Sequence, residues 1–146
     1  MQVLGPDSGM QACGEEGLGR MLEPEQLVQH IMASFQPKLL SGKKVLITAG
    51  PTYEAIDAVR GITNRSSGKM GYAIAQAASE AGAEVTLISG PTALATPLAT
   101  QRIDVQSAAQ MYSAVMQTVA DCNIFISVAA VADYRIAQQS VQKIKK

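Results

Sequence analysis

The hydrophobic positions of this chain change near residue 40 from sparse to regularly spaced. Residues 1–22 are rich in glycine and turn-forming residues and carry no apolar period, which predicts a loop or flap. Glycine at this density suits a segment that closes over a ligand, although a flexible linker explains the composition equally well. The spacing over residues 24–35 predicts a helix with Pro24 in its first turn. Its apolar face would be formed by Leu27, Val28, Ile31, Met32 and Phe35.

Strand and helix patterns alternate from residue 43 onward. Apolar runs at 45–48, 84–89, 102–105 and 123–128 predict four strands, and the apolar character of the last predicts that it is buried. This order predicts an α/β fold, a Rossmann-like doubly wound parallel sheet with right-handed crossovers, preceded by the Gly-rich flap and a helix. We expect the strand order third, second, first, fourth, with the loops after the first and fourth strands flanking a ligand-binding crevice.

The two helices between these strands carry different signals. The pattern after Gly68 predicts a helix that ends at Gly82. Its buried stripe would be formed by Met70, Ala73, Ile74, Ala77, Ala78 and Ala81. Ser107 and Gln110 predict a capping box for a second helix that reaches about Ala120. The apolar face of that helix would be formed by Ala108, Met111, Tyr112, Val115 and Val119.

Composition narrows the possible partners. A length of 146 residues and 47% hydrophobic content allow a domain with a sizeable core. Twelve basic and twelve acidic side chains give a net charge of zero, so nothing electrostatic favours nucleic acid or an anionic membrane. No run is long enough for a membrane span, no signal peptide is recognisable, and Cys13 and Cys122 are too few for a disulfide framework. We expect a reduced, cytoplasmic setting, and both ends have the character of cuts from a longer protein.

Residues 64–71, Asn-Arg-Ser-Ser-Gly-Lys-Met-Gly, run from a loop into the clearest predicted helix. A helix N-terminus offers unpaired backbone N–H groups and the positive pole of the helix dipole, which favour anions. The hydroxyls of Ser66 and Ser67, the flexible Gly68 and the charge of Lys69 therefore indicate phosphate binding. A capped helix with a glycine-containing turn remains the alternative.

Two familiar nucleotide motifs are absent from this region. A Walker loop needs G-x-x-x-x-G-K-[ST], but six residues separate Gly61 from Gly68, and Met70 stands where Ser or Thr should bind magnesium. The dinucleotide fingerprint G-x-G-x-x-G is also missing after the first strand, and Ser89-Gly90 closes the second strand in place of an acidic residue. Asp133, just beyond the fourth strand, could hold a metal ion or a ligand, or only cap a turn. With both motifs absent, the sequence indicates a Rossmann-like domain that binds an anion through a different, less usual loop.

Four motifs, in order along the chain, closely resemble the bacterial phosphopantothenate–cysteine ligase domain. They are Thr48–Thr52, Asn64–Gly71, Ala129–Tyr134 and Lys143–Lys146. The glycine-rich stretch 5–21 resembles the substrate flap of phosphopantothenoylcysteine decarboxylase, the domain that precedes the ligase in the bifunctional coenzyme A biosynthesis flavoprotein. The resemblance implies that residues 1–40 are the C-terminal flap and helix of a decarboxylase domain plus a linker. It implies that residues 41–146 are the N-terminal part of the ligase domain.

For the ligase domain the resemblance implies a two-step reaction. The carboxylate of 4′-phosphopantothenate attacks the α-phosphate of CTP, and cysteine then displaces CMP from the acyl-cytidylate. Asn64 would act on this intermediate by hydrogen bonding its activated carbonyl, and Lys143 would steady charge on the transferring phosphates, with magnesium accompanying the triphosphate. Lys145 and Lys146 would add only positive potential. Matching nucleotide contacts are Gly50, Ser66, Ser67, Gly68, Lys69, Ser127, Val128, Ala129, Asp133 and Lys143.

For the decarboxylase domain the resemblance implies FMN as cofactor and Cys13 as the flap cysteine that supplies a proton. A thiol suits that task because its pKa lies nearer neutrality than that of a hydroxyl. The full-length protein is expected to be a homo-oligomer. The alternative function is a Rossmann-like nucleotide- or dinucleotide-binding module without catalysis, which the extended reading frame would distinguish by the absence of a flavin domain upstream.

The segment 53–63 is the least regular part of the predicted domain. Residues 54–57 are compatible with a helical turn. The segment also departs from the family, since Tyr53 stands in place of the usual arginine and Gly61 in place of the usual aromatic residue. Both residues flank the site, so the resemblance implies no particular substrate contacts for residues 53–61.

We predict that this chain, supplied with FMN and phosphopantothenoylcysteine, releases no carbon dioxide, because the FMN-binding body of the decarboxylase is not among its residues. Capture of isotopically labelled carbon dioxide is the measurement. Release above a protein-free blank would contradict the prediction.

Overall fold

The computed structural model describes residues 3–145, which fall into two compact units, 1–37 and 38–146. The first unit contains an antiparallel hairpin of β1 (Asp7–Met10) and β2 (Glu16–Arg20), followed by α1 (Pro24–Phe35). The segment predicted as a loop or flap thus contains two paired strands, which the sequence analysis did not predict. The strands pair through their backbones, with Gly9 opposite Gly17, and the turn is closed by a hydrogen bond from Gln11 N to Glu15 O (2.8 Å). Pairing of this kind needs no apolar period.

Helix α1 has the predicted bounds, and Glu23 and Gln26 form a capping box at its start. None of its residues is buried. The large side chains of its apolar face, including Ile31 and Phe35, are exposed. The helical period is thus present in the sequence without a covering surface in the structure.

The second unit is built on a four-stranded parallel sheet in the order β7-β6-β3-β8. In chain order these strands are β3 (Lys44–Ala49), β6 (Glu84–Ser89), β7 (Thr100–Asp104) and β8 (Ile124–Ser127). The predicted fold class and the predicted strand order are both confirmed. The two central strands, β3 and β6, are buried except at their first residues and at the half-buried Thr86, which explains their continuous apolar runs.

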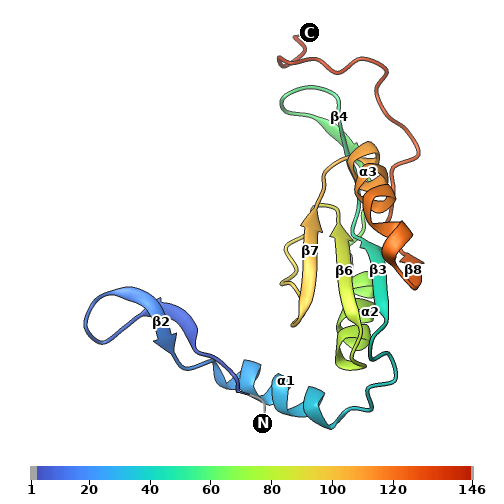
Figure 1. Cartoon of the computed structure of the whole chain (residues 1–146). Helices are drawn as coiled ribbons and strands as arrows, with labels where there is room; N and C mark the ends of the chain where they lie inside the picture. The colour runs from blue at the N-terminus through green and yellow to red at the C-terminus, as the bar shows by residue number, and fades with distance from the viewer. Residues whose placement is uncertain (1–2, 146) are drawn as a thin grey trace. The chain divides into compact units, whose positions relative to one another are not determined.

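Two helices cover the two faces of this sheet (Figure 1). Because side chains alternate along a strand, Val45, Ile47 and Ala49 pack with α2 (Lys69–Glu80), and Leu46 packs with α3 (Ala108–Thr118). A 3₁₀ turn, Val119–Asp121, follows α3. The predicted capping box of Ser107 with Gln110 is confirmed, including the bond from Gln110 N to Ser107 Oγ (3.2 Å).

The predicted buried stripe of α2 is largely wrong. The buried residues are Gly71, Tyr72, Ala75 and Ala78. Met70 is instead 63% exposed. A side chain at Gly71 would place its Cβ 2.5 Å from the Cβ of Ala49 on β3, so the helix lies against the sheet at glycine distance. The small residues Gly71, Ala75 and Ala78 determine which face of α2 is buried. The prediction followed hydropathy alone and therefore selected a neighbouring face.

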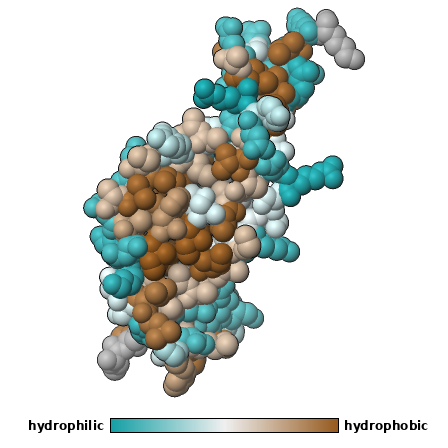
Figure 2. Space-filling model, turned by 90° about the vertical axis from the view of Figure 1, so that its right-hand side faces the viewer, coloured by the Kyte–Doolittle hydropathy of each residue, from teal (hydrophilic) through white to brown (hydrophobic). Residues whose placement is uncertain are grey.

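Two other burial predictions also fail. Tyr112, expected on the apolar face of α3, is 67% exposed, whereas Met111 beside it is buried. Strand β8 lies at the edge of the sheet, and its Ile124 and Phe125 are exposed. Figure 2 shows a broad hydrophobic surface on the side of the molecule where β8 lies in Figure 1. An apolar strand is therefore not a buried strand here, because nothing among the described residues covers its outer side.

The irregular segment 53–63 forms a second hairpin, of β4 (Tyr53–Ala55) and β5 (Gly61–Thr63). The helical turn suggested for 54–57 is wrong. Strands of three residues carry too few positions for a period to be recognised. This hairpin leads directly into the loop that begins α2.

We predict that Gly71→Ala destabilises this unit by about 1–3 kcal/mol, because the added methyl group overlaps Ala49 and forces α2 away from the sheet. Helix propensity alone would give the opposite sign. Urea unfolding measures the change, and Ala73→Ser on the exposed face of α2 is the control, expected within about 0.5 kcal/mol. A more stable Gly71→Ala variant would show that the close contact has no energetic weight.

Candidate functional site

The loops after β3 and β8 lie side by side at the carboxyl edge of the sheet. Ala130 N donates to Gly50 O (2.8 Å), and Thr52 N donates to Ala130 O (3.2 Å). Thr52 is fully buried, and its Oγ1 accepts a hydrogen bond from Ala132 N (2.8 Å). These bonds bring two predicted motifs, 48–52 and 129–134, into one surface, at the place where open α/β sheets bind ligands.

Close backbone contact brings two further loops to this edge. Gly50 has φ +74°, and a Cβ there would lie 3.1 Å from Gly90 O in the loop after β6. Gly68 also has φ +74°, and its Cβ would lie 3.2 Å from the Cα of Gly50. At both positions glycine is required by conformation and by space. The predicted phosphate loop therefore rests directly on the end of β3.

Residues 66–69 form the N-terminus of α2, as predicted. Ser66 Oγ accepts from Gly68 N (3.3 Å), and Ser67 Oγ accepts from Lys69 N (3.5 Å). Thr92 Oγ1 donates to Ser67 O (3.2 Å), which ties the loop to the end of β6. The first turn contains no acidic residue, and Lys69 is exposed. Helix dipole, hydroxyl groups and ammonium group together produce a positive potential suited to an anion.

Asn64 connects the phosphate loop to the segment after β8. Its Nδ2 donates to Val131 O (2.9 Å) and to Ala130 O (3.3 Å), so both amide hydrogens are used. Two carbonyl acceptors fix which way the amide faces, because an oxygen in the same position would be repelled. No partner of the amide oxygen is found among residues 3–145, so this acceptor is the group that remains for a ligand. The sequence prediction had used the amide as a donor.

The other predicted residues of this edge lie on the same segment. Ser127 Oγ accepts from Thr48 Oγ1 (3.5 Å) at the end of β8, and Val128 packs partly against the core. Ala129 is half-buried, and Asp133 is exposed. Cys13 is exposed in the first unit, in the turn between β1 and β2, and its Sγ lies 3.8 Å from Gln11 Oε1.

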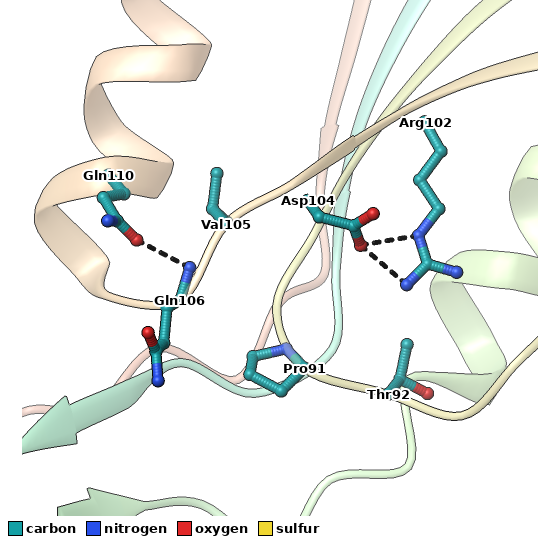
Figure 3. A pocket seen from close by; sticks show the side chains of 7 residues that line it. All are labelled: Pro91, Thr92, Arg102, Asp104, Val105, Gln106 and Gln110. Carbon is teal, nitrogen blue, oxygen red and sulfur yellow. Dashed lines mark hydrogen bonds and ion pairs between the residues drawn. The ribbon is translucent and has the colours of Figure 1, made fainter. Parts of the chain in front are cut away.

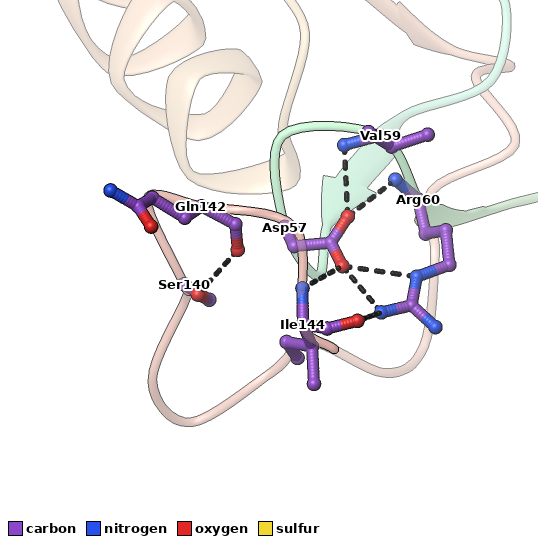
Figure 4. A network of polar contacts seen from close by, with 6 residues as sticks. All are labelled: Asp57, Val59, Arg60, Ser140, Gln142 and Ile144. Carbon is purple, nitrogen blue, oxygen red and sulfur yellow. Dashed lines mark hydrogen bonds and ion pairs between the residues drawn. The ribbon is translucent and has the colours of Figure 1, made fainter. Parts of the chain in front are cut away.

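Lys143, which is exposed, belongs to a terminal segment held by a buried carboxylate that the sequence analysis missed (Figure 4). Asp57 Oδ1 accepts from Val59 N and Arg60 N, both at 2.8 Å. Asp57 Oδ2 accepts from the Arg60 guanidinium (2.5 and 3.0 Å) and from Ile144 N (3.1 Å). The Arg60 guanidinium beside Asp57, helped by these backbone amides, holds the pKa of that carboxyl well below its ordinary value. Lys146 of the same motif lies outside the described residues.

A second missed carboxylate anchors the hairpin to α3. Glu54 is buried, and its Oε1 accepts from Ala108 N (2.7 Å) at the helix N-terminus, where negative charge is favoured. Tyr53 N donates to Gln106 O (2.7 Å) just before the same helix. The Asp57-x-x-Arg60 spacing is a signal that could have been read in advance. Glu54 has no comparable signal, because its partner is 54 residues away.

Tyr53 and Gly61 lie next to one another in the hairpin. The ring of Tyr53 lies where a side chain at residue 61 would begin, since a Cβ on Gly61 would come within 2.6 Å of the Tyr53 hydroxyl oxygen. An aromatic ring thus covers this part of the hairpin. It is supplied by β4 and lies over Gly61 of β5.

A separate open cavity of about 770 Å³ lies at the carboxyl ends of β6 and β7 (Figure 3). Its lining residues are Pro91, Thr92, Arg102, Asp104, Val105, Gln106 and Gln110. Arg102 is already engaged, because it pairs with Asp104 (2.7 Å) and donates to Leu94 O (2.9 Å). Gln110 Oε1 is engaged as well, because it accepts from Gln106 N (2.7 Å).

Protein ligands for a metal are not assembled at this edge. Among the described residues, no group of three or more His, Cys, Asp or Glu side chains could hold a metal ion. Asp133 is the one predicted carboxylate near the phosphate loop. Separately, no described helix has the length and apolar character needed to cross a bilayer.

Comparisons with known proteins agree on one family. A model for the DNA/pantothenate metabolism flavoprotein C-terminal domain matches residues 40–146. The chain is 62% identical over 146 residues to the coenzyme A biosynthesis bifunctional protein CoaBC of Vibrio vulnificus (strain YJ016), and the match covers 100% of this chain and 36% of that protein. A crystal structure of the C-terminal domain of CoaBC has a TM-score of 0.68 at 54% identity and covers 70% of this chain and 53% of that one. A Cab2 mutant in complex with phosphopantothenate-cysteine, at 18% identity, shares the fold with a TM-score of 0.62 and covers 82% of this chain and 55% of its own.

We predict that Asp57 makes the stability of this unit depend on acid pH. Its pKa is lower in the folded state than the value of about 4 in an unfolded chain, so its stabilisation is complete above about pH 4 and is lost as the pH falls further. Urea unfolding from about pH 5 to about pH 2 should therefore show a shallower decline for Asp57→Asn than for the unchanged chain. Asp121→Asn, an exposed carboxylate in the 3₁₀ turn, should keep the original slope. Equal slopes for all three proteins would contradict the prediction.

Proposed function

Because the chain belongs to the DNA/pantothenate metabolism flavoprotein family, we propose that residues 41–146 form part of a ligase domain that joins 4′-phosphopantothenate to cysteine with CTP. The family resemblance inferred from the four sequence motifs is confirmed. The chain spans 36% of the length of the Vibrio vulnificus relative, which is a bifunctional protein of coenzyme A biosynthesis. The activity of the whole protein, its substrates and its partners are accordingly part of the proposal.

The contact of Asn64 with Ala130 and Val131 is the observation that carries this proposal. It joins the phosphate loop to the segment that follows β8, so that one surface presents an anion-binding helix end and a polar acceptor close to it. A reaction that activates a carboxylate with a nucleotide needs both features, one for phosphate oxygens and one for the acyl group. The Cab2 mutant, a protein of the same fold, is in complex with phosphopantothenate-cysteine, which is the product expected of this reaction.

The phosphate loop would bind the nucleotide. Ser66, Ser67, Gly68 and Lys69 offer hydroxyl, amide and ammonium donors, and no carboxylate in the first turn of α2 opposes an anion. Gly50 lets the loop approach the end of β3, and the segment 127–129 forms the facing wall. The carboxylate of 4′-phosphopantothenate would attack the α-phosphate of CTP here and release pyrophosphate.

Asn64 would act in the second step, when the amine of cysteine attacks the acyl carbon and CMP leaves. Its amide oxygen can accept a hydrogen bond from the attacking amine, while its two N–H groups keep the 130–131 backbone in place. This replaces the donor role expected from the sequence. Asp133 would accept a donor group of the nucleotide.

Lys143 would balance negative charge on the transferring phosphates. Magnesium would arrive bound to the triphosphate, since the described residues offer no cluster of three ligands, and magnesium commonly binds through substrate phosphates with one or two carboxylates. Asp133 would complete such a set.

The first unit would belong to the flavin-dependent decarboxylase of the same protein. The family is named as a flavoprotein, and FMN in the full-length protein follows from that membership. FMN would supply the redox chemistry. Cys13, exposed in the hairpin turn, would deliver a proton, and its exposure fits a flap residue that meets its substrate on closure.

We predict that Asn64→Asp in the full-length protein lets the acyl-cytidylate accumulate. A carboxylate facing the carbonyl oxygens of Ala130 and Val131 would disturb the second step while leaving the phosphate loop intact. Mass spectrometry after incubation with CTP and 4′-phosphopantothenate detects the intermediate, and product formation should fall by about a hundredfold or more.

The matched control is Gln117→Glu, the same amide-to-carboxylate change on the exposed surface of α3. It should form product at the unchanged rate. Normal product formation by Asn64→Asp would remove Asn64 from the mechanism. If the unchanged full-length protein releases no pyrophosphate from CTP in the presence of 4′-phosphopantothenate and forms no amide with cysteine, the ligase assignment itself is overturned.

A further inference from the structure

The segment after Asp133 is attached to the hairpin at few points. Ser140 N donates to Ile56 O (3.1 Å). Ile144 is held on both sides of its backbone, since its N–H donates to Asp57 Oδ2 (3.1 Å) and its carbonyl accepts from Arg60 Nη2 (3.2 Å). Among the described residues these are the backbone hydrogen bonds that tie 134–145 to the rest of the unit. Figure 4 shows the two at Ile144.

Asp57 does more than close its own turn. The two bonds at Oδ1 already satisfy the turn amides of Val59 and Arg60. Oδ2 instead faces outward to the terminal segment and holds both Ile144 N and the guanidinium that binds Ile144 O. The Asp57 side chain is fully buried in this arrangement, and burying a carboxylate is unfavourable unless its oxygens are bonded. The terminal segment supplies part of that bonding.

The hairpin links this clamp to the phosphate loop. Thr63 Oγ1 donates to Thr52 O (2.7 Å) at the end of β5, which fixes the hairpin to the carboxyl edge of the sheet. Asn64 follows directly. Glu54 and Tyr53 hold the other strand to the start of α3. Residues that lie far apart in the sequence therefore share one rigid support.

We propose that Asp57 is a positioning residue for the ligation reaction: it holds Ile144 and thereby sets the place of Lys143 relative to the phosphate loop. The proposal rests on the proposed function for the role of Lys143, whereas the clamp itself can be tested without it. Lys143 and Lys145 flank the clamped residue, so freeing Ile144 frees both. Placing an ammonium group before reaction lowers the entropy lost on reaching the transition state.

The first test is structural and uses the full-length protein. Asp57→Asn keeps an acceptor oxygen for the turn amides but puts an N–H₂ group where Oδ2 accepted three bonds. Hydrogen exchange of the peptide containing Ile144 should become at least about tenfold faster, and trypsin should cleave after Lys143 sooner. Asp121→Asn, a carboxylate with no part in the clamp, should change neither. Unchanged exchange and cleavage in Asp57→Asn would overturn the proposal.

The second test is kinetic. Asp57→Asn should lower kcat of ligation about tenfold with little change in KM for CTP, because the ground-state contacts of the phosphate loop remain. Combined with Lys143→Ala, it should lower kcat no further than Lys143→Ala alone. Losses that multiply in the double variant would overturn the positioning role. If Lys143→Ala alone leaves ligation unchanged, the proposed role of Lys143 fails, and the exchange measurement still decides whether Asp57 holds the segment.

If Asp57→Asn does not fold, a variant at Ile144 tests the same contact from the other side. Ile144→Pro removes the donor to Asp57 from the exposed side and leaves every bond of the Asp57 turn in place. It should reproduce the kcat loss and the faster hydrogen exchange of the amides flanking residue 144; trypsin is not used for this variant, because it does not cleave a Lys–Pro bond. Wild-type kcat in Ile144→Pro would contradict the proposal.

Discussion

The structure depends above all on how closely its backbone segments approach one another at the carboxyl edge of the sheet. Gly71 lets α2 lie against β3 at a distance that no side chain allows, and Gly50 and Gly68 bring the phosphate loop onto the end of the same strand. The position of the helix end follows from this packing. An anion bound there would therefore be held by amides fixed through the core of the domain, which is the kind of preorganisation that electrostatic catalysis needs.

Two buried carboxylates, those of Glu54 and Asp57, hold the β4–β5 hairpin and the terminal segment in place. The β4–β5 hairpin has only short strands, and so few backbone bonds hold it. Glu54 fastens it to the start of α3, and Asp57 fastens the terminal segment to it. Each acid meets donors that would otherwise be unpaired, since the amides of a helix start or a tight turn have no partner within their own element. Charge thus substitutes for the apolar packing that so small a hairpin lacks.

Sequence reasoning succeeded where many residues report the same property. The strand order and fold class followed from long apolar runs in β3 and β6 and from the alternation with helices. It failed where one small or distant residue decides. The buried face of α2 depends on Gly71 and Ala75, which carry little hydropathy signal. The exposure of Phe125 depends on the position of β8 at the sheet edge. The clamp on Ile144 joins residues 87 positions apart, and no local pattern records such a bond.

The ring of Tyr53 fills the space beside Gly61 in the β4–β5 hairpin. The ring comes from β4 and occupies the space that a side chain on β5 would take. A side chain at residue 61 would overlap this ring in its present position, and the ring would have to turn away to make room. A side chain added at residue 61 would therefore be accommodated only as the ring of Tyr53 moves, and the hairpin surface next to the phosphate loop would change with it.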